Sequence, residues 1–159
     1  MKIRNVIIFL SLIVSINVFG QKIYDEEIDA LKQIDNAIEK ADKENKYVLA
    51  MVGGNWCKWC LIFNEKVEKT PQIKQFIEDN FVFIHINYSK NNKNEKAMER
   101  LNYPNRFGFP VFVILNQKGE RIHTQNSAYL EENNGYSDKK VMDFLDKWTI
   151  KATTTSPFK

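Results

Sequence analysis

The sequence predicts an α/β fold in which a central mixed sheet of about four strands is flanked by helices. Two short, largely apolar runs, over 47–52 and 81–87, are separated by a helical pattern, and this order predicts two parallel strands joined by a crossover. Two further runs, over 110–115 and 120–124, enclose the turn signal Asn116-Gln117-Lys118-Gly119 and predict an antiparallel hairpin. Parallel and antiparallel pairs in one sheet make that sheet mixed.

The chain has the length and composition of one globular domain. It contains 159 residues, of which 43% are hydrophobic and 13% aromatic, and this excludes disorder over the whole length. The formal net charge of +3 falls to about +1 when Lys2 and Arg4 of an N-terminal leader are removed. So small a charge provides no electrostatic footprint for nucleic-acid binding.

The first 20 residues have the pattern of a secretory signal. Lys2 and Arg4 precede a mostly apolar run over 6–19, and a cut is expected after Gly20. The run is shorter than the roughly 20 apolar residues of a membrane-spanning helix. We therefore expect residues 1–20 to be cleaved and the mature protein to be periplasmic or secreted, with an uncleaved membrane anchor as the alternative.

Helical patterns occur on both sides of the first strand. Apolar residues at three- and four-residue steps predict an amphipathic helix over about 26–45. Gly53-Gly54 ends the strand, Asn55 is a candidate cap, and a helix is predicted over 57–69. Thr70-Pro71 then indicates a break and a second helix start.

The later part of the chain is predicted to contain loops and two further helices. The first predictions are a polar loop over 88–96, a short helix over 97–101 that Pro104 ends, and a loop over 126–136. Ser137 is expected to cap a final amphipathic helix that reaches Trp148. Residues 152–159 are expected to be a flexible tail, so the globular domain is expected over 21–151.

Cys57 and Cys60 are the two cysteines of the chain, and they lie three positions apart at the predicted junction of strand and helix. A disulfide across so short a loop restricts the unfolded chain little, so a structural role explains the pair poorly. The backbone N–H groups and dipole at a helix N-terminus stabilise a thiolate, which makes Cys57 the predicted nucleophile. Cys60 faces the same side one turn later and is the predicted resolving thiol.

The segments YVLAMVGGNWCKWC, FVFIHIN and RFGFPVFVILNQKGERI resemble the thioredoxin superfamily, in particular secreted thioredoxin-like proteins with a WCxWC motif. The resemblance covers nearly the whole chain after the leader. It implies a thioredoxin-like fold and a thiol-disulfide oxidoreductase that acts on disulfides of exported proteins, more as a reductant than as an oxidant. It implies a membrane or periplasmic redox partner and no cofactor or metal, and we expect a monomer.

The resemblance also implies roles for the residues near 110. Pro110 would be a cis-proline whose loop lies beside the disulfide and presents backbone groups to substrate, although most X-Pro bonds are trans. Phe109 would form an apolar rim, or else pack within the strand. With Trp56, Lys58 and Trp59, these residues are the expected substrate-binding set.

Two positions between the cysteines depart from the Gly-Pro that is familiar in thioredoxin. Lys58 places a cation near both sulfurs, which would stabilise the reduced form and make the couple more oxidising, unless the side chain points into water. Trp59 is either a partner-binding aromatic or a cover over the helix start.

Met51 stands where the family often carries a buried acid that moves the proton of the second cysteine. His85, in the neighbouring predicted strand, is therefore a candidate proton acceptor for Cys60, and a packed, hydrogen-bonded histidine is the alternative. His123, in the hairpin, is expected to face solvent.

Two other functions remain open on the sequence. A binding module with inert thiols would recognise a partner through Trp56, Trp59 and Phe109. A zinc site would combine both cysteines with His85 and His123, but these histidines lack the paired spacing of structural zinc sites.

Overall fold

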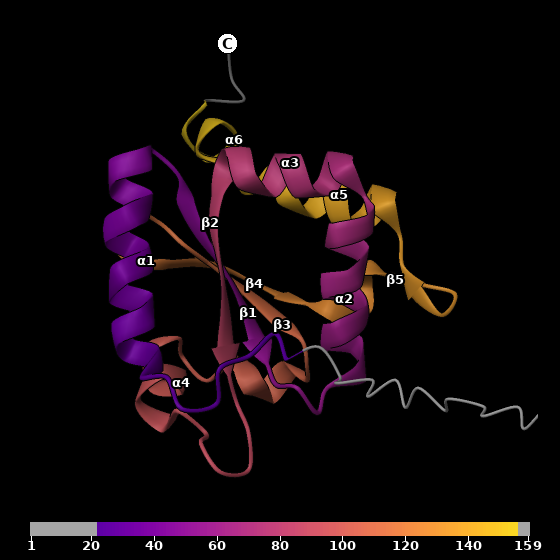
Figure 1. The fold of residues 1–159 in the computed structure, drawn as a ribbon. Coiled ribbons are helices and arrows are strands. Elements are labelled where there is room, and N and C mark those ends of the chain that lie inside the picture. The colour runs from indigo at the N-terminus through magenta and orange to yellow at the C-terminus, as the bar shows by residue number, and fades with distance from the viewer. Residues whose placement is uncertain (1–21, 156–159) are drawn as a thin grey trace, which may run out of the picture.

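A computed structural model describes residues 22–155 and places a four-stranded sheet between two layers of helices (Figure 1). The strands are β1 (Tyr47–Gly53), β2 (Phe81–Asn87), β3 (Val111–Leu115) and β4 (Arg121–Asn126). Their order is β2-β1-β3-β4, with β1 parallel to β2 and antiparallel to β3, and β3 antiparallel to β4. The predicted mixed sheet, its parallel pair and its hairpin are all confirmed.

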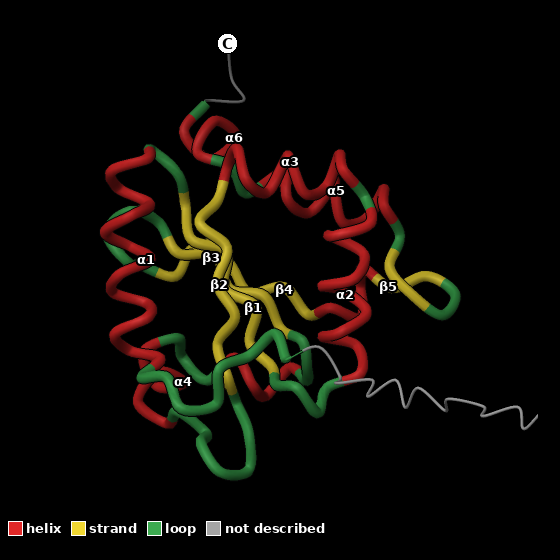
Figure 2. Tube along the Cα trace, in the orientation of Figure 1, coloured by secondary structure: helices red, strands yellow, loops and turns green. Residues whose placement is uncertain are grey.

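Helices cover both faces of the sheet, as Figure 2 shows in red on either side of the yellow strands. One face is covered by α1 (Ala30–Glu44) and α4 (Glu95–Arg100), and the other by α2 (Lys58–Lys69), α3 (Pro71–Asn80) and α5 (Asp138–Lys147).

Each face of the sheet has its own hydrophobic core, and β1 contributes to both. Leu49 and Met51 join the core under α2, α3 and α5. Val48, Ala50 and Val52 join the core under α1 and α4. Every residue of β1 is buried, which explains the continuous apolar run seen in the sequence.

The first helix begins later than its apolar periodicity predicted. Asp29 is the N-cap of α1, and its carboxylate accepts hydrogen bonds from the backbone N–H groups of Leu31 and Lys32. Residues 22–29 consequently form an irregular segment before the helix, which we call the N-terminal strap. The break between α2 and α3 falls at Thr70-Pro71, as predicted.

Several local predictions after residue 95 are wrong. Pro104 does not end α4, which ends at Arg100, but begins the 3-10 helix η1 (Pro104–Phe107). The predicted loop over 126–136 contains the 3-10 helix η2 and a two-stranded ribbon, and Ala152 to Thr154 belong to a last helix rather than to a tail. These elements are η2 (Ser127–Leu130), β5 (Glu131–Glu132), β6 (Gly135–Tyr136) and α6 (Ile150–Thr154).

Ser137 precedes α5 as predicted, but its side chain makes no capping hydrogen bond. Within residues 22–155, no helix has the length and apolar character needed to cross a membrane. The predicted signal over 1–20 lies outside the described residues, as do the last residues of the predicted tail.

Candidate active site

The candidate site forms where β1 ends and α2 begins. Cys57, rather than the predicted Asn55, is the N-cap residue of α2, with an extended backbone at φ −88° and ψ 102°. Its Sγ accepts a hydrogen bond from the backbone N–H of Cys60 at 3.2 Å. The sulfur of Cys57 therefore lies at a helix N-terminus, where backbone N–H groups and the helix dipole stabilise negative charge.

Cys57 and Cys60 form a disulfide with a Cα–Cα distance of 5.2 Å, so the predicted proximity of the two sulfurs is confirmed. Cys60 is fully buried, whereas Cys57 exposes 4% of its surface. Cys57 is thus the less buried of the two cysteines.

The sheet register places Pro110 at the end of the sheet where β1 leads into the cysteine turn. Val52 pairs with Val111 across the antiparallel β1–β3 ladder, so Gly53 and Pro110 follow at the same end of the sheet. The Phe109–Pro110 peptide bond is cis, as the resemblance implied.

Three aromatic residues form a rim beside the site, namely Trp56, Tyr88 and Phe109. The ring of Phe109 packs edge-to-face on Trp56 at a centroid distance of 5.2 Å and stacks on Tyr88 at 5.1 Å. The indole N–H of Trp56 donates to the carbonyl oxygen of Tyr88 at 2.8 Å, and 57% of Trp56 stays exposed. Phe109 thus packs against both neighbouring rings and is also part of the rim. Tyr88 could not be predicted from the sequence, because it begins a polar segment.

Lys58 and Trp59 differ in their surroundings. Lys58 is exposed at the first position of α2, where solvent screens its charge. Trp59 is half-buried, and its ring packs edge-to-face on Tyr136 at 5.6 Å. The hydroxyl of Tyr136 donates to the backbone carbonyl of Trp59 at 3.3 Å. These contacts favour the interpretation of Trp59 as a cover over the helix start.

His85 lies opposite Met51 in the β1–β2 ladder. Its ring packs against Phe83 at 4.7 Å and against Tyr24 at 5.4 Å. Within residues 22–155 its buried Nε2 atom has no hydrogen-bond partner, and burial lowers the pKa of His85 to about 4. His85 is therefore neutral at pH 7 and a weak proton acceptor.

Tyr24, in the N-terminal strap, approaches Cys60. A Cβ atom built on Gly53 would overlap the Sγ of Cys60 and lie 2.7 Å from the hydroxyl oxygen of Tyr24. The sulfur and the hydroxyl therefore occupy neighbouring space over the same glycine. Tyr24 was not predicted from the sequence, because it precedes the helical pattern and belongs to no periodic run.

Asn55 fixes the strap against the site. Its Oδ1 accepts hydrogen bonds from the backbone N–H groups of Ile23 and Tyr24, both at 3.0 Å, and its Nδ2 donates to the carbonyl of Tyr24 at 2.8 Å. The amide of Asn55 is thus bound to the strap, which explains why it does not cap α2.

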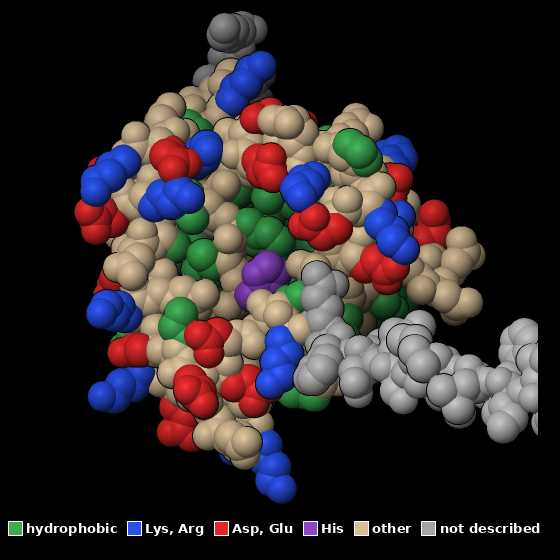
Figure 3. Space-filling view, in the orientation of Figure 1, with side chains coloured by type: hydrophobic (Ala, Val, Ile, Leu, Met, Phe, Trp, Pro, Cys, Tyr) green, Lys and Arg blue, Asp and Glu red, His purple; other side chains and the backbone are tan. Residues whose placement is uncertain are grey.

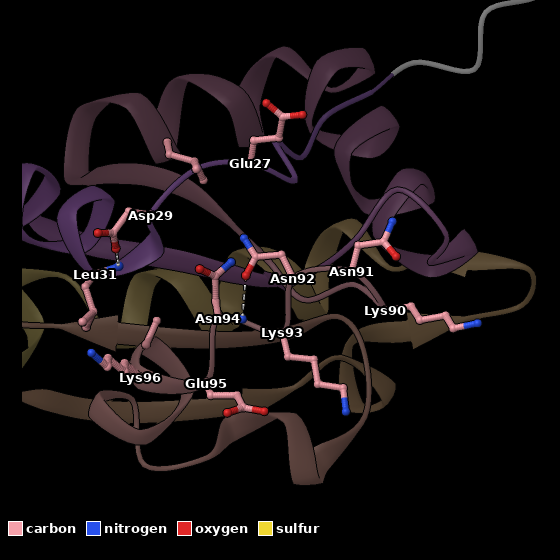
Figure 4. Close-up of a pocket in the computed structure, with 12 residues that line it drawn as sticks. Glu27, Asp29, Leu31, Lys90, Asn91, Asn92, Lys93, Asn94, Glu95 and Lys96 are labelled. Carbon is pink, nitrogen blue, oxygen red and sulfur yellow. Dashed lines mark hydrogen bonds between the residues drawn. The ribbon is translucent and has the colours of Figure 1, made fainter.

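A separate polar pocket lies between the start of α1 and the loop after β2, where Lys90 and Lys93 extend outward (Figure 4). Asn92 donates to the carbonyl of Glu26 at 2.9 Å. Asn94 accepts a hydrogen bond from the N–H of Ala30 at 3.3 Å. These amides hold the strap and the start of α1 in place.

The two histidines do not meet at the cysteine pair. His85 lies on β2 and His123 on β4, the opposite edge strands of the sheet. His123 stacks on Trp148 at a centroid distance of 4.1 Å, so the prediction that it simply faces solvent is wrong. Within residues 22–155 no three potential metal-ligating side chains of His, Cys, Asp or Glu gather in one place.

Acidic and basic side chains alternate over the face seen in Figure 3, with hydrophobic side chains visible between them in the middle. No single-sign region dominates this face. A field of mixed sign does not favour a strongly charged partner there.

Several solved structures have the same fold. A disulphide isomerase from Xylella fastidiosa Temecula1 matches with a TM-score of 0.68 and 26% identity, over 78% of this chain and 94% of that one. DsbH oxidoreductase matches with a TM-score of 0.53 and 19% identity, over 70% of this chain and 81% of that one. A thioredoxin from Thermus thermophilus matches with a TM-score of 0.55 and 17% identity, over 74% of this chain and 85% of that one. The last two likenesses show the fold alone.

No curated protein matches the chain. Residues 29–117, more than half of the sequence, match a family model described as thioredoxin-like. That stretch runs from the cap of α1 through the cysteine pair and the cis-proline to the end of β3. The chain has a thioredoxin-like disulfide oxidoreductase fold with a disulfide across its CxxC pair, and it belongs to the thioredoxin-like family.

Proposed function

We propose that this protein is a thiol-disulfide oxidoreductase that reduces disulfides of exported proteins, with Cys57 as the nucleophile and Cys60 as the resolving thiol. The observation that carries the proposal is the Cys57 sulfur at the N-cap of α2, where it accepts the N–H of Cys60. The likeness to a disulphide isomerase supports the same class of chemistry.

The proposed reaction has two exchange steps. The Cys57 thiolate attacks one sulfur of a substrate disulfide, and the other substrate sulfur leaves as a thiolate. Cys60 then loses its proton and attacks the Cys57 sulfur, which breaks the mixed disulfide and releases the second substrate sulfur. The substrate gains two electrons and two protons, and the pair becomes a disulfide that a membrane or periplasmic dithiol partner reduces again.

Substrate binding is proposed at Trp56, Phe109 and Pro110, together with Lys58 and Trp59. The exposed indole of Trp56 and the ring of Phe109 provide apolar surface next to Cys57. The loop before β3 provides backbone groups for an extended polypeptide. Such a surface suits an unfolded or flexible protein segment better than a small polar molecule.

The solvent exposure of Lys58 supports reduction over oxidation, because a cation held against the sulfurs would stabilise the thiolate and make the pair more oxidising. Equilibration with glutathione buffers is expected to give a reduction potential below roughly −200 mV. A potential near about −120 mV, the value of a strong oxidant, would reverse the proposed direction.

Trapping of reaction intermediates tests the exchange chemistry. The variant Cys60→Ser should accumulate mixed disulfides with exported proteins, visible on a non-reducing gel, because the resolving thiol is lost. Cys57→Ser is the matched control and should trap none through the nucleophile position. An empty gel for both variants would contradict the proposed route.

A binding module with inert thiols is the alternative, and the near-complete burial of both cysteines favours it. Alkylation rates of the reduced protein as a function of pH separate the two functions. A Cys57 that ionises well below the ordinary pKa of about 8.5 supports the enzyme. Ionisation near that value would support the binding module.

Export is proposed from the pattern of residues 1–20. Mass spectrometry of the protein expressed with its full sequence should find a mature chain that begins at Gln21. Retention of residues 1–20 in a membrane fraction would instead support an uncleaved anchor.

A further inference from the structure

We propose that the hydroxyl of Tyr24 is a catalytic group of the resolving step, in which it donates a hydrogen bond to the Cys60 sulfur while that sulfur is a thiolate. The inference rests on the proposed dithiol-disulfide exchange and adds to it a group that acts on Cys60 and not on Cys57.

The first support is the shared position of the two atoms. A single methyl group on Gly53 would contact both the Cys60 sulfur and the Tyr24 hydroxyl oxygen. Only a glycine at the end of β1 leaves this space open. The hydroxyl is therefore directed at the sulfur side of the core and not at solvent.

The second support is that this hydroxyl makes no hydrogen bond to the part of the oxidised chain that the structure describes. Tyr24 is 3% exposed, and its hydroxyl has no hydrogen-bond partner among residues 22–155. A buried hydroxyl without a partner costs free energy. Opening the disulfide creates an acceptor beside it, because a thiolate accepts hydrogen bonds that a disulfide sulfur accepts only weakly.

The third support comes from the surroundings of Cys60. The core that contains Cys60 includes the tyrosines Tyr24, Tyr47 and Tyr136 and, in the part of the chain that the structure describes, no buried carboxylate, amine or guanidinium. The hydroxyl of Tyr47 bonds to Thr153 Oγ1 at 3.0 Å, and that of Tyr136 to the carbonyl of Trp59. Tyr24 is the tyrosine of this core whose hydroxyl is available.

His85 is less suited to act on Cys60 itself. It lies on the neighbouring strand with its ring against the ring of Tyr24. It is neutral at pH 7, because burial lowers its pKa to about 4. In the resolving step the Cys60 proton leaves to solvent, and Tyr24 keeps its own proton because burial raises its pKa far above the ordinary value.

The strap holds Tyr24 in this position before reaction. Three hydrogen bonds join the backbone of Ile23 and Tyr24 to the side chain of Asn55, in the turn between β1 and α2. The backbone of the residue that carries the hydroxyl is thus hydrogen-bonded to the turn that precedes the cysteine pair, and little ordering is required when the thiolate forms.

The variant Tyr24→Phe tests the proposal, because it removes the hydroxyl and keeps the ring. The reduced protein is mixed with the disulfide of 5-thio-2-nitrobenzoate, and release of the coloured thiolate is followed by stopped flow. Attack by Cys57 releases the first thiolate and resolution by Cys60 the second. Tyr24→Phe should leave the first phase unchanged, slow the second about tenfold and move its pH profile to higher pH by about one unit.

Tyr47→Phe is the matched control, since it also removes a buried tyrosine hydroxyl but at the far end of β1. It should keep both phases and the pH profile of the wild type. If Tyr24→Phe resolves as fast as the wild type with an unmoved pH profile, the role of Tyr24 is overturned while the exchange reaction stands. If the wild type releases no thiolate at all, the proposed function itself fails.

Discussion

Gly53 is the residue on which the packing of the site depends most directly. It ends β1, and the space over its Cα holds the Cys60 sulfur and the Tyr24 hydroxyl. The absence of a side chain at this position lets α2 and the N-terminal strap approach the same point. The conformation of Gly53 is ordinary; its close neighbours make the glycine necessary.

Replacing Gly53 by alanine should destabilise the oxidised protein by about 1–3 kcal/mol, because the added Cβ would overlap the Cys60 sulfur. Gly135→Ala is the control, since a Cβ there has nothing within 4 Å. Its stability should stay within about 0.5 kcal/mol of the wild type. Urea unfolding of both oxidised variants measures the difference, and equal midpoints would show that the site relaxes around the methyl group.

Some residues of the site could be predicted from the sequence, and others could not. Cys57, Cys60 and Pro110 could be predicted because short motifs carry their chemistry. Tyr24 and Tyr88 could not, because neither lies in a periodic run and both reach the site through tertiary contacts alone. The position of Asn55 before a helix predicts a cap, but the side-chain amide of Asn55 bonds to the N-terminal strap instead. The sequence does not reveal that the strap lies beside Asn55.

The start of α1 also depends on a contact that its apolar periodicity does not show. The residues of the N-terminal strap include Ile28, which fits the apolar periodicity of α1, but the side chain of Asp29 offers the backbone a cap and the helix starts at Ala30. The preceding residues are then free to cross towards the cysteine turn. Boundaries of strands β1 and β2 were predictable because continuous apolar runs between breakers leave little choice.

Removal of the Asn55 side chain should loosen the strap. Asn55→Ala deletes the acceptor of the Ile23 and Tyr24 N–H groups and the donor to the Tyr24 carbonyl. We expect a loss of about 1–3 kcal/mol in unfolding free energy and faster hydrogen exchange at Ile23 and Tyr24.

Asn91→Ala is the control for the strap, because Asn91 is exposed and its side chain makes no hydrogen bond within residues 22–155. It should match the wild type in unfolding and in hydrogen exchange. If Asn55→Ala exchanges no faster than this control at residues 23 and 24, other contacts hold the strap.

At the scale of the whole molecule, the sheet divides the interior into two cores with different chemistry. The core under α1 and α4 consists of aliphatic and small residues with one methionine, whereas the core under α2, α3 and α5 holds the disulfide and most buried aromatic rings. The site thus lies at the edge of a rigid aromatic core, which suits a reaction that requires two sulfurs held in fixed geometry. The continuous apolar run of β1 could be predicted, and it implies a strand covered on both faces. Which of the two cores receives the cysteines is decided by the connection from β1 to α2.

His85 couples the stability of the whole protein to pH. Its pKa is about 4 in the folded protein, because burial disfavours the charged form, whereas the ordinary pKa of an exposed histidine is about 6.5. As the pH falls, His85 therefore binds a proton in the unfolded chain at a higher pH than in the folded protein. The contribution of neutral His85 is fully present above about pH 6.5 and is lost between about pH 6.5 and 4, by up to about 3 kcal/mol.

The variant His85→Phe should remove this part of the acid sensitivity, because phenylalanine can keep the ring contacts with Tyr24 and Phe83 without a titrating group. Urea unfolding at pH 7, 5.5 and 4.5 gives the slope for each protein. His123 and the surface carboxylates with lowered pKa, such as Glu39 and Asp143, remain in both proteins, so they contribute equally to both slopes. Parallel slopes would mean that His85 titrates alike in the folded and unfolded states, and hence that water reaches its ring.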